Sequence, residues 1–214
     1  MQIGILGSGE VGQALGLGFA QLGHEVKIGS REPVAEKLKP WLARAGKKAS
    51  TGSFEETARF ADVAVLAVHW SGTQSAIGLA KPENLAGKVV MDVTNPVVSE
   101  PGKPLRLALG HTDSGGEQVQ RWLPKSKVVK AFNSVGSDHM VNPQFPGGPP
   151  DMFICGDDAS AKQVVAGICR NFGWGVVDAG GIEGARLLEP LCLLWMAHGL
   201  KTGSWDHAFK LLQK

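Results

Sequence analysis

The sequence predicts a doubly wound α/β fold, in which a mostly parallel sheet lies between two layers of helices. Short runs rich in valine and isoleucine recur along the chain, and stretches of helical composition separate them. The runs are continuously apolar rather than alternating, which is typical of strands buried on both faces. With 214 residues, the chain has room for one such domain and a small appendage.

Strands and helices are expected to alternate from the first residues onward. The strands are expected at 3–6, 26–28, 63–68, 89–92, 128–132, 152–155 and 176–177. The helices are expected at 11–22, 36–45, 54–60, 73–79, 116–122, 160–172, 183–200 and 205–212. The proline-rich segments 95–110 and 142–150 are expected to be loops. Asp157 and Asp158 are expected to cap the helix at 160–172, and residues 112–117 to begin the helix at 116–122.

The end of the chain differs from the rest. Between Leu187 and Met196 apolar residues surround the expected helix nearly completely, so this helix must be buried under a cap or in a subunit interface. We therefore expect residues 1–180 to form the sheet domain. Residues 181–214 are expected to form a helical segment that packs on that domain or in a dimer interface.

Composition excludes several classes of function. The net charge of +2 provides no basic surface for nucleic acid or an anionic membrane. Cys155, Cys169 and Cys192 have neither disulfide nor zinc-site spacing, which favours a reducing compartment. The first residues lack the pattern of a secretory signal, and no apolar stretch reaches the ~20 residues that span a bilayer. A cytoplasmic protein is therefore expected.

The first strand is followed by a glycine-rich motif. Residues 7–12 read Gly-Ser-Gly-Glu-Val-Gly, the G-x-G-x-x-G pattern between a strand and a helix that is typical of dinucleotide binding. Gly7 permits the tight turn, Gly9 lets the backbone approach a pyrophosphate, and Gly12 lets the helix pack closely on the strand. The start of the helix offers unpaired N–H groups to the phosphates.

The end of the second strand indicates which dinucleotide is bound. An NAD-binding domain usually carries an acidic residue about 20 residues after the glycine motif, but this chain has Ser30 and Arg31 there. A hydroxyl and a guanidinium suit a 2′-phosphate, so NADP(H) is favoured over NAD(H). Lys37 and other lysines follow, and for these a solvent-exposed helix face is the simpler interpretation.

Ordered matches along nearly the whole chain resemble the F420-dependent NADP reductases and the cytosolic domains of six-transmembrane metalloreductases. Besides the glycine motif, the matching segments are GSR at 29–31, DVAVL at 62–66 leading to Trp70, DVTNP at 92–96, VVKAFN at 128–133, CGDD at 155–158, VDAG at 177–180 and ARLLE at 185–189. The resemblance implies a Rossmann-type domain, usually dimeric, that holds NADP(H) and exchanges hydride with a flavin-type acceptor.

The resemblance also implies the positions that hold the cofactor. Ser8, Glu10 and Val11 would lie along the pyrophosphate, and Ser30 and Arg31 would hold the 2′-phosphate. The nicotinamide end would be enclosed by Val68, His69, Trp70, Asn95, Ala131 and Asn133. After the fifth strand this chain reads Phe-Asn-Ser-Val, which is closer to the metalloreductases than the His-x-Ile-Pro pattern of the F420 reductases.

No constellation for proton transfer stands out. The chain contains no tyrosine and lacks the sequence patterns of nucleophilic triads and zinc peptidases. Hydride transfer between two stacked rings needs orientation rather than an acid or base. His69 is the single candidate for an acid, with a hydrogen bond to the cofactor or a role in packing as the alternatives. Trp70 either stacks on a ring or packs over the sheet edge, and His111, His139, His198 and His207 lack metal-ligand spacing.

Three functions are therefore open. The first is hydride transfer between NADP(H) and a small-molecule acceptor, namely coenzyme F420, FMN or FAD. The second is reduction of a small carbonyl or imine by NADPH. The third is a non-catalytic NADPH-binding sensor or redox partner, for which the apolar helix at 187–196 would be the contact surface.

Overall fold

The computed structural model describes residues 1–214 and contains a central six-stranded parallel sheet. The strand order is β3-β2-β1-β4-β5-β8. The bounds are β1 Gln2–Leu6, β2 Glu25–Gly29, β3 Ala49–Gly52, β4 Val63–Leu66, β5 Val89–Asp92 and β8 Lys127–Lys130. β2 and β3 lie on one side of β1, whereas β4, β5 and β8 lie on the other, so the strand order reverses between β1 and β4. The carboxyl ends of these two strands form the switch point where such sheets bind ligands. The predicted doubly wound fold is confirmed.

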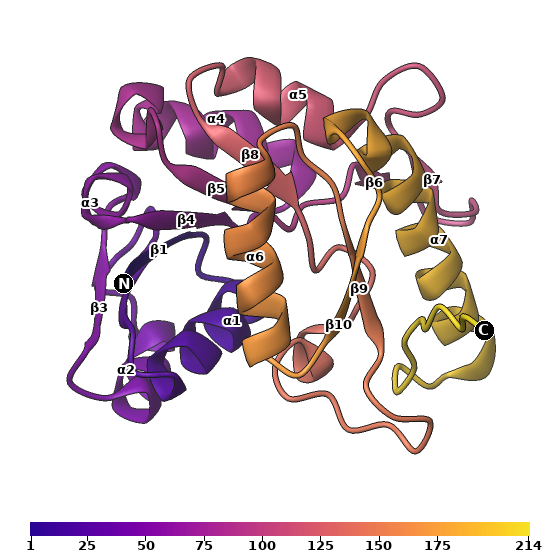
Figure 1. Ribbon diagram of the computed structural model, residues 1–214. Helices are drawn as coiled ribbons and strands as arrows, with labels where there is room; N and C mark the ends of the chain where they lie inside the picture. The colour runs from indigo at the N-terminus through magenta and orange to yellow at the C-terminus, as the bar shows by residue number, and fades with distance from the viewer.

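Helices cover both faces of the sheet. The first face carries α1 (Glu10–Gln21), α2 (Lys39–Ala45) and α6 (Ala159–Asn171), and the second carries α3 (Phe54–Phe60), α4 (Trp70–Ala80) and α5 (Gly115–Trp122) (Figure 1). Neighbouring residues of β1 enter different cores, since Ile5 packs toward α1 whereas Leu6 packs toward α3 and α4. Both side chains are fully buried, which explains why the strands are continuously apolar.

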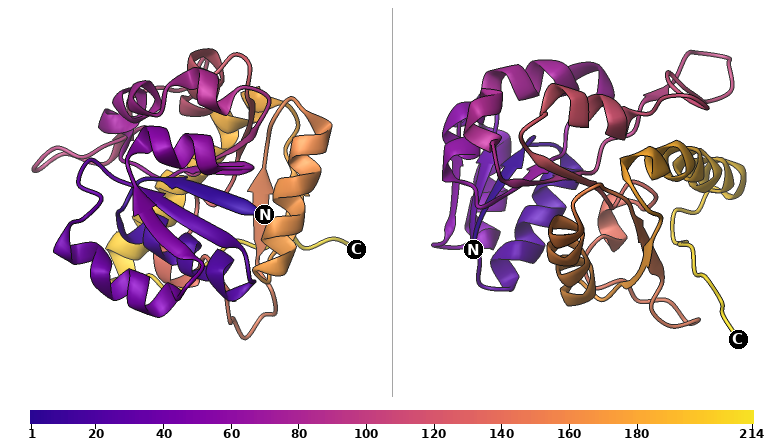
Figure 2. Two further views of the ribbon diagram at one scale, coloured as in Figure 1. Left: turned by 90° about the vertical axis from the view of Figure 1, so that its left-hand side faces the viewer. Right: turned by 45° about the horizontal axis from the view of Figure 1, so that its top comes forward.

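Smaller elements complete the chain. A second parallel pair, β9 (Asp151–Ile154) and β10 (Gly175–Asp178), is joined to β8 by one bridge between Lys130 and Cys155. The hairpin of β6 (Val97–Val98) and β7 (Arg106–Leu107) projects from the body (Figure 2). The helix α7 (Ala185–Thr202) lies on the side away from the N-terminal strands (Figure 1). The 3-10 turns are η1 Glu36–Leu38, η2 Pro82–Leu85, η3 Ser137–His139 and η4 Ile182–Gly184.

The prediction of a helix at 205–212 was wrong. This segment is extended, because its backbone bonds to the start of β9 instead of to itself. The Asp151 N–H donates to the carbonyl of Phe209 at 2.9 Å, and the Leu211 N–H donates to the Asp151 carboxylate at 2.8 Å. The Trp205 ring lies against Trp195 of α7, with 5.1 Å between the ring centroids. Contacts with distant parts of the chain therefore override the local helical preference.

Three further details differ from the expectation. The edge strand β3 was not predicted, because Ala-Ser-Thr-Gly carries no large apolar side chain. The helix expected at 36–45 is divided into η1 and α2, and Pro40 stands at the start of α2, where a missing N–H is tolerated. The strand expected at 63–68 ends at Leu66. Val68 consequently belongs to the loop between β4 and α4, at the ligand-binding edge.

The predicted helix starts are confirmed by their capping bonds, except that Asp157 does not cap α6: its carboxylate accepts from the Ile182 N–H at 2.8 Å instead. The Asp158 carboxylate accepts from the Ala161 N–H at 2.8 Å at the start of α6, and the Ser114 hydroxyl accepts from the Glu117 N–H at 3.2 Å at the start of α5. Each side chain satisfies an N–H group that has no partner inside its helix.

Stability is expected to depend on pH through Asp158. Hydrogen bonds from Ser160 and the Ala161 N–H, with the Lys127 ammonium, lower the pKa of Asp158 to about 2. Because the pKa is lower in the folded state, this stabilisation is present above the ordinary carboxyl pKa and is lost as the pH falls toward 2. The Asp158→Ala variant should melt below the unmodified protein at pH 7, and the difference should shrink between about pH 4 and pH 2. A difference that stays constant with pH would contradict this account.

The helix α7 is buried on one side and open on the other. Leu188, Cys192 and Trp195 are buried against the domain, but 71% of Leu187 and 60% of Leu194 are exposed. The sequence predicted that this helix would be covered all round. Within one chain, only the side of α7 that faces the domain is buried. Burial of the other side in a subunit interface stays a prediction.

Candidate active site

The glycine motif forms a tight loop between β1 and α1. Gly7 has a φ of 132°, and a Cβ atom there would lie 2.0 Å from the Ala67 carbonyl oxygen. A Cβ atom on Gly12 would lie 2.2 Å from the Gly7 carbonyl oxygen. Neither position has room for a side chain, so both glycines are required by the packing of strand, loop and helix. This is the role that the motif predicts.

Gly9 is different, because its surroundings are open. No atom lies within 4 Å of the position that a Cβ would take. Gly9 is the N-cap of α1 and supplies no side-chain hydrogen bond, so the first N–H groups of this 12-residue helix have no side-chain partner. Open space in front of free N–H groups at a helix start suits a phosphate. The residues present therefore fit the pyrophosphate of a dinucleotide.

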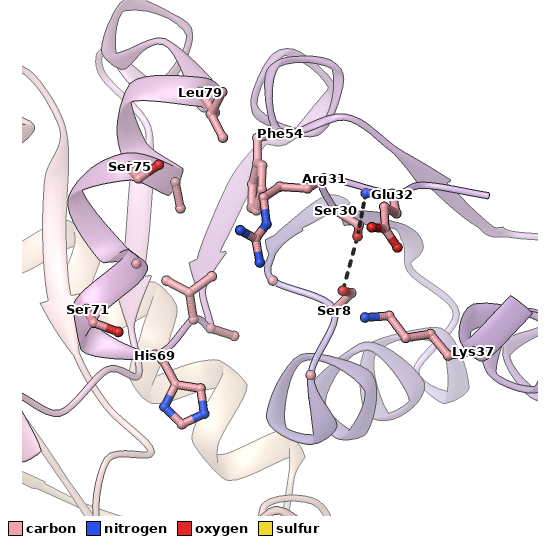
Figure 3. Close-up of a pocket in the computed structure, with 16 residues that line it drawn as sticks. Ser8, Ser30, Arg31, Glu32, Lys37, Phe54, His69, Ser71, Ser75 and Leu79 are labelled. Carbon is pink, nitrogen blue, oxygen red and sulfur yellow. Dashed lines mark hydrogen bonds between the residues drawn. The ribbon is translucent and has the colours of Figure 1, made fainter. Parts of the chain in front are cut away.

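Two serines and two cations lie beside this loop at the end of β2. The Ser8 hydroxyl donates to the Ser30 oxygen at 3.2 Å, and that oxygen also accepts from the Glu32 N–H at 3.1 Å. Arg31 and Lys37 are exposed and form no ion pair within the protein. In Figure 3 the Lys37 ammonium points toward Ser8 from η1, and the Arg31 guanidinium extends toward α4. The two unpaired cations and hydroxyls suit a phosphate monoester.

These groups line a cavity of about 670 Å³. The cavity runs from the end of β2, past the glycine loop, to the start of α4 (Figure 3). Its lining residues are Gly7, Ser8, Gly9, Ser30, Arg31, Glu32, Lys37, Phe54, Ala67, Val68, His69, Ser71, Gly72, Ser75, Ala76 and Leu79. One side is therefore polar and cationic, whereas Phe54, Ala76 and Leu79 make the opposite side apolar. A mixed lining of this kind suits a nucleotide, which has charged phosphates and a flat base.

Seven of the fourteen predicted binding residues line this cavity: Gly7, Ser8, Gly9, Ser30, Arg31, Val68 and His69. Glu10, Val11 and Gly12 follow in the first turn of α1, with Val11 packed against the core. Trp70 stacks on Trp122 with 5.6 Å between ring centroids, which favours the packing role over a ring contact with a ligand.

His69 is the N-cap of α4 and is exposed. Its carbonyl accepts from the Gly72 N–H at 2.9 Å, but its imidazole forms no hydrogen bond with the protein. A catalytic histidine is usually oriented by a partner on its second nitrogen. Since no partner orients this ring, its geometry fits a ligand contact better than an acid catalyst.

Asn95 and Asn133 lie at the carboxyl ends of β5 and β8, the edge that also holds the glycine loop. The Asn95 amide donates to the Asn133 carbonyl at 2.7 Å, and the Asn133 amide donates to the Asn95 side-chain oxygen at 3.1 Å. Ala131 is fully buried in the core, so its side chain is not available to a ligand. A paired set of carboxamides thus stands where the nicotinamide end was predicted.

A cluster of charged residues lies beneath the two asparagines and was not predicted. Asp92 and Lys130 have no exposed surface, and 1% of Glu189 is exposed. The Lys130 ammonium lies 2.8 Å from Asp92 and 3.1 Å from Glu189, and it donates to the Thr94 carbonyl at 2.8 Å. Burial alone would lower the pKa of Lys130, but the two carboxylates raise it above its usual value. The lysine is therefore charged.

Sequence signals for the missed residues existed but were ambiguous. Asp92 and Lys130 each end an apolar strand, and Glu189 interrupts an apolar helix, so all three are charges in places that are otherwise buried. Sequence cannot say that these charges meet. Lys37 was interpreted as a surface lysine, although the turn η1 brings it to the cavity wall.

The structure contains no group of His, Cys, Asp and Glu that could hold a metal ion. The three cysteines are buried and unpaired, and burial raises the pKa of each thiol to about 12. They therefore stay protonated and unreactive. Of the helices, none combines the length and hydropathy that crossing a bilayer requires.

Comparison with known proteins identifies the relatives of the chain. Residues 2–96 match the family model described as NADP oxidoreductase, coenzyme F420-dependent. An F420-dependent NADP reductase of Methanocaldococcus jannaschii is 33% identical over 217 residues, which cover 95% of each protein. The chain belongs to the F420-dependent NADP reductase family. It is therefore an NADP-dependent oxidoreductase, and the resemblance stated from its motifs is confirmed.

Other known proteins resemble the chain to different degrees. The crystal structure of a putative F420-dependent NADP reductase from Arthrobacter sp. FB24 superimposes with a TM-score of 0.93 at 36% identity over the whole of both chains. The metalloreductase STEAP3 of Rattus norvegicus is 33% identical over 200 residues, which are 90% of this chain and 37% of that protein. An imine reductase from Streptomyces aurantiacus, at 17% identity and a TM-score of 0.68, shares the fold alone.

Proposed function

We propose that this oxidoreductase transfers hydride between NADP(H) and a flavin-type acceptor, namely coenzyme F420, FMN or FAD. One observation carries the proposal: the cavity combines a phosphate-binding loop and two unpaired cations with a reactive end that has no proton relay. The names of relatives that match nearly the whole chain support F420 as the first acceptor to test.

The absence of a proton relay distinguishes flavin-type acceptors from carbonyl and imine substrates. Reduction of a carbonyl or imine needs a proton donor near the reacting atom, and donors of this kind are held in place by neighbouring groups. His69 has no such neighbour. Hydride transfer between two stacked rings depends on their orientation and separation instead. This chemistry agrees with a site in which carboxamides and backbone groups dominate.

The cavity and the asparagine pair at the same edge of the sheet each have a role in this proposal. The N–H groups at the start of α1 bind the pyrophosphate, with Ser8 beside them. Ser30, Arg31 and Lys37 bind the 2′-phosphate. Val68 and His69 flank the nicotinamide half, while Asn95 and Asn133 bind the carboxamide of the nicotinamide ring. When bound, NADPH supplies the hydride, and the protein fixes the face from which it leaves.

The decisive experiment is anaerobic oxidation of NADPH by the purified protein with F420, FMN and FAD in parallel, repeated with NADH. Turnover with F420 would identify the deazaflavin as acceptor, despite the Phe-Asn-Ser-Val segment at 132–135. Turnover with FMN or FAD alone would place the chain with the metalloreductase domains. Tight NADPH binding without oxidation of NADPH by any of the three would overturn the proposal.

The choice of cofactor is tested by Arg31→Ala. A charge-assisted hydrogen bond contributes about 1.5 to 3 kcal/mol, so NADPH affinity should fall roughly 10- to 150-fold. NADH lacks the 2′-phosphate, and its affinity should hardly change. Calorimetric titration of both cofactors measures this, with Arg44→Ala of α2 as the control because Arg44 lies outside the cavity. An equal loss for both cofactors would show that Arg31 does not bind the 2′-phosphate.

We also infer that the chain acts as a homodimer in the cytoplasm. The open side of α7 presents Leu187 and Leu194, each more than half exposed and two turns apart on one face, and leucines on one helix face suit an interface between copies. The unpaired thiols agree with a reducing compartment. Light scattering should give twice the chain mass, and Leu187→Glu with Leu194→Glu should reduce it to the mass of one chain.

A further inference from the structure

We infer that the buried cluster of Asp92, Lys130 and Glu189 positions the Asn95–Asn133 pair for the nicotinamide, and that it ties the helix α7 to the reactive end of the site. This inference rests on the proposed function, because it takes the nicotinamide to lie at the carboxyl ends of β5 and β8. The three charged residues act through the asparagines, so they are positioning residues.

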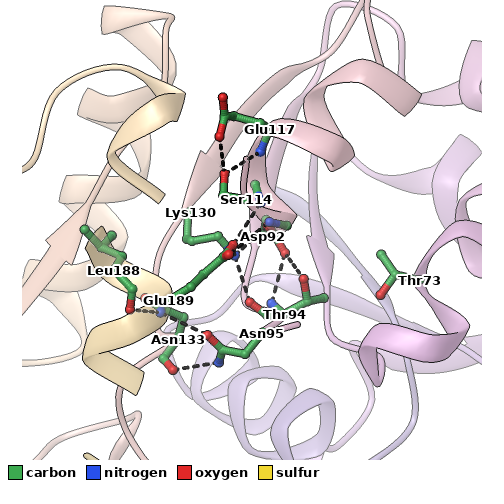
Figure 4. Close-up of polar contacts among 12 residues, drawn as sticks. Thr73, Asp92, Thr94, Asn95, Ser114, Glu117, Lys130, Asn133, Leu188 and Glu189 are labelled. Atoms are coloured by element: carbon green, nitrogen blue, oxygen red, sulfur yellow. Dashed lines mark hydrogen bonds and ion pairs between the residues drawn. The ribbon is translucent and has the colours of Figure 1, made fainter. Parts of the chain in front are cut away.

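The cluster joins three separate parts of the chain. Asp92 ends β5, Lys130 ends the neighbouring strand β8, and Glu189 lies on the first turns of α7. Figure 4 shows the three side chains converging, with the asparagines alongside. Glu189 also accepts hydrogen bonds from the N–H groups of Gly115 and Gly116, both at 2.9 Å, at the start of α5. One carboxylate thus links α7, α5 and the sheet.

The two asparagines lie in the segments that follow β5 and β8. Asn95 comes three residues after Asp92, and Asn133 comes three residues after Lys130. The Asp92 carboxylate accepts from the backbone N–H and the hydroxyl of Thr94 at 2.9 and 2.7 Å, and Lys130 binds the Thr94 carbonyl. The peptide that leads into Asn95 is therefore fixed on both sides.

The Asn133 side chain is held by a hydrogen bond to the helix α7. Its amide donates to the carbonyl of Leu188 at 2.7 Å, and Leu188 directly precedes Glu189. Its side-chain oxygen is buried and accepts no hydrogen bond from the protein. A buried acceptor without a donor is costly, and the amide of a nicotinamide carboxamide is a donor of the right kind. The unpaired Asn133 side-chain oxygen is therefore an independent observation that points to a ligand beside the two asparagines.

Stability alone does not account for the cluster. Burying charges carries a desolvation cost that their attraction need not offset, so an apolar replacement of similar shape is often as stable. Two carboxylates share one ammonium, and the second carboxylate is compensated by backbone N–H groups of α5. What the cluster does provide is directional bonds that fix Thr94, and through Leu188 also Asn133, in one arrangement.

The test compares ligands that reach different parts of the site. The double variant Lys130→Met with Asp92→Asn removes one cation and one anion together and leaves Glu189 bonded to Gly115 and Gly116. Glu117→Gln is the matched control, because the Glu117–Arg186 pair also links α5 to α7 but touches none of the residues around Asn95 and Asn133. Circular dichroism and a cooperative thermal transition confirm that each variant is folded.

NADP⁺ and adenosine 2′,5′-bisphosphate are titrated by calorimetry against each protein. The double variant should bind NADP⁺ about tenfold more weakly, as expected for the loss of one hydrogen bond to the carboxamide. The bisphosphate lacks nicotinamide, so its affinity should stay within about twofold. The control should bind both ligands like the unmodified protein.

Other results would overturn the inference. Equal weakening for both ligands would make the cluster a general structural element, and unchanged NADP⁺ binding would show that the asparagines do not depend on it. If the unmodified protein binds the bisphosphate as tightly as NADP⁺, the asparagines do not hold the carboxamide. Failure of the unmodified protein to bind NADP⁺ would instead refute the proposed function.

Discussion

Gly12→Ala is expected to weaken the binding of NADP(H) at least a hundredfold and to destabilise the protein. A Cβ atom at this position would lie 2.2 Å from the Gly7 carbonyl oxygen, which is backbone and has no flexible end that can move aside. The start of α1 has to move away from the loop by about 1 Å to relieve the contact. Overpacking of this kind costs about 1 to 3 kcal/mol of unfolding free energy.

The same displacement removes the phosphate site. The N–H groups of α1 would no longer point at the position of the pyrophosphate. Loss of two charge-assisted hydrogen bonds, each about 1.5 kcal/mol, corresponds to at least a hundredfold weaker binding of NADPH. Titration of NADPH fluorescence measures the affinity, and urea unfolding measures the stability.

Gly9→Ala is the control that separates the two effects. No protein atom lies within 4 Å of the new Cβ, so the stability should be nearly unchanged. The methyl group would occupy the space in front of the helix start, and NADPH binding should still be weakened. If Gly9→Ala binds NADPH normally, the pyrophosphate does not lie at this loop, and the assignment of the cavity is wrong.

The parts of the molecule that the sequence predicts well are those with a local physical cause. β1 and β4 are short apolar runs buried on both faces, and Gly12 is required by its contact with the Gly7 carbonyl within the motif itself. Ser114 and Asp158 cap helices within three residues of their own positions. In each case the residues that decide the structure are close together in the sequence.

The parts that were missed depend on distant residues. The extended tail at 205–212 follows from hydrogen bonds to Asp151, and the strand β3 is formed by pairing with β2. Lys130 and Glu189 are 59 positions apart (189 − 130) and meet only because α7 folds back on β8. Local patterns of polarity contain no information about such pairs, although each charge was conspicuous in an apolar segment.

Lys130→Met is expected to cost about 3 to 5 kcal/mol of unfolding free energy, the range for removing one partner of a buried ion pair. The substitution leaves the carboxylates of Asp92 and Glu189 facing each other across an apolar side chain, and it leaves the Thr94 carbonyl without its donor. Denaturation in urea, extrapolated linearly to water, measures the loss. Lys162→Met is the control, because its pair with the half-exposed Asp178 should contribute less than about 1 kcal/mol.

Adding Asp92→Asn to Lys130→Met should restore much of the lost stability. The second substitution removes the Asp92 anion, which has lost its ammonium partner, while Glu189 keeps the N–H groups of Gly115 and Gly116. Two substitutions that act on one network are not additive, so the double variant should be more stable than Lys130→Met alone. If the two losses simply add, the charges act independently. The cluster would then not be the single unit that ties α7 to the strand ends beneath Asn95 and Asn133.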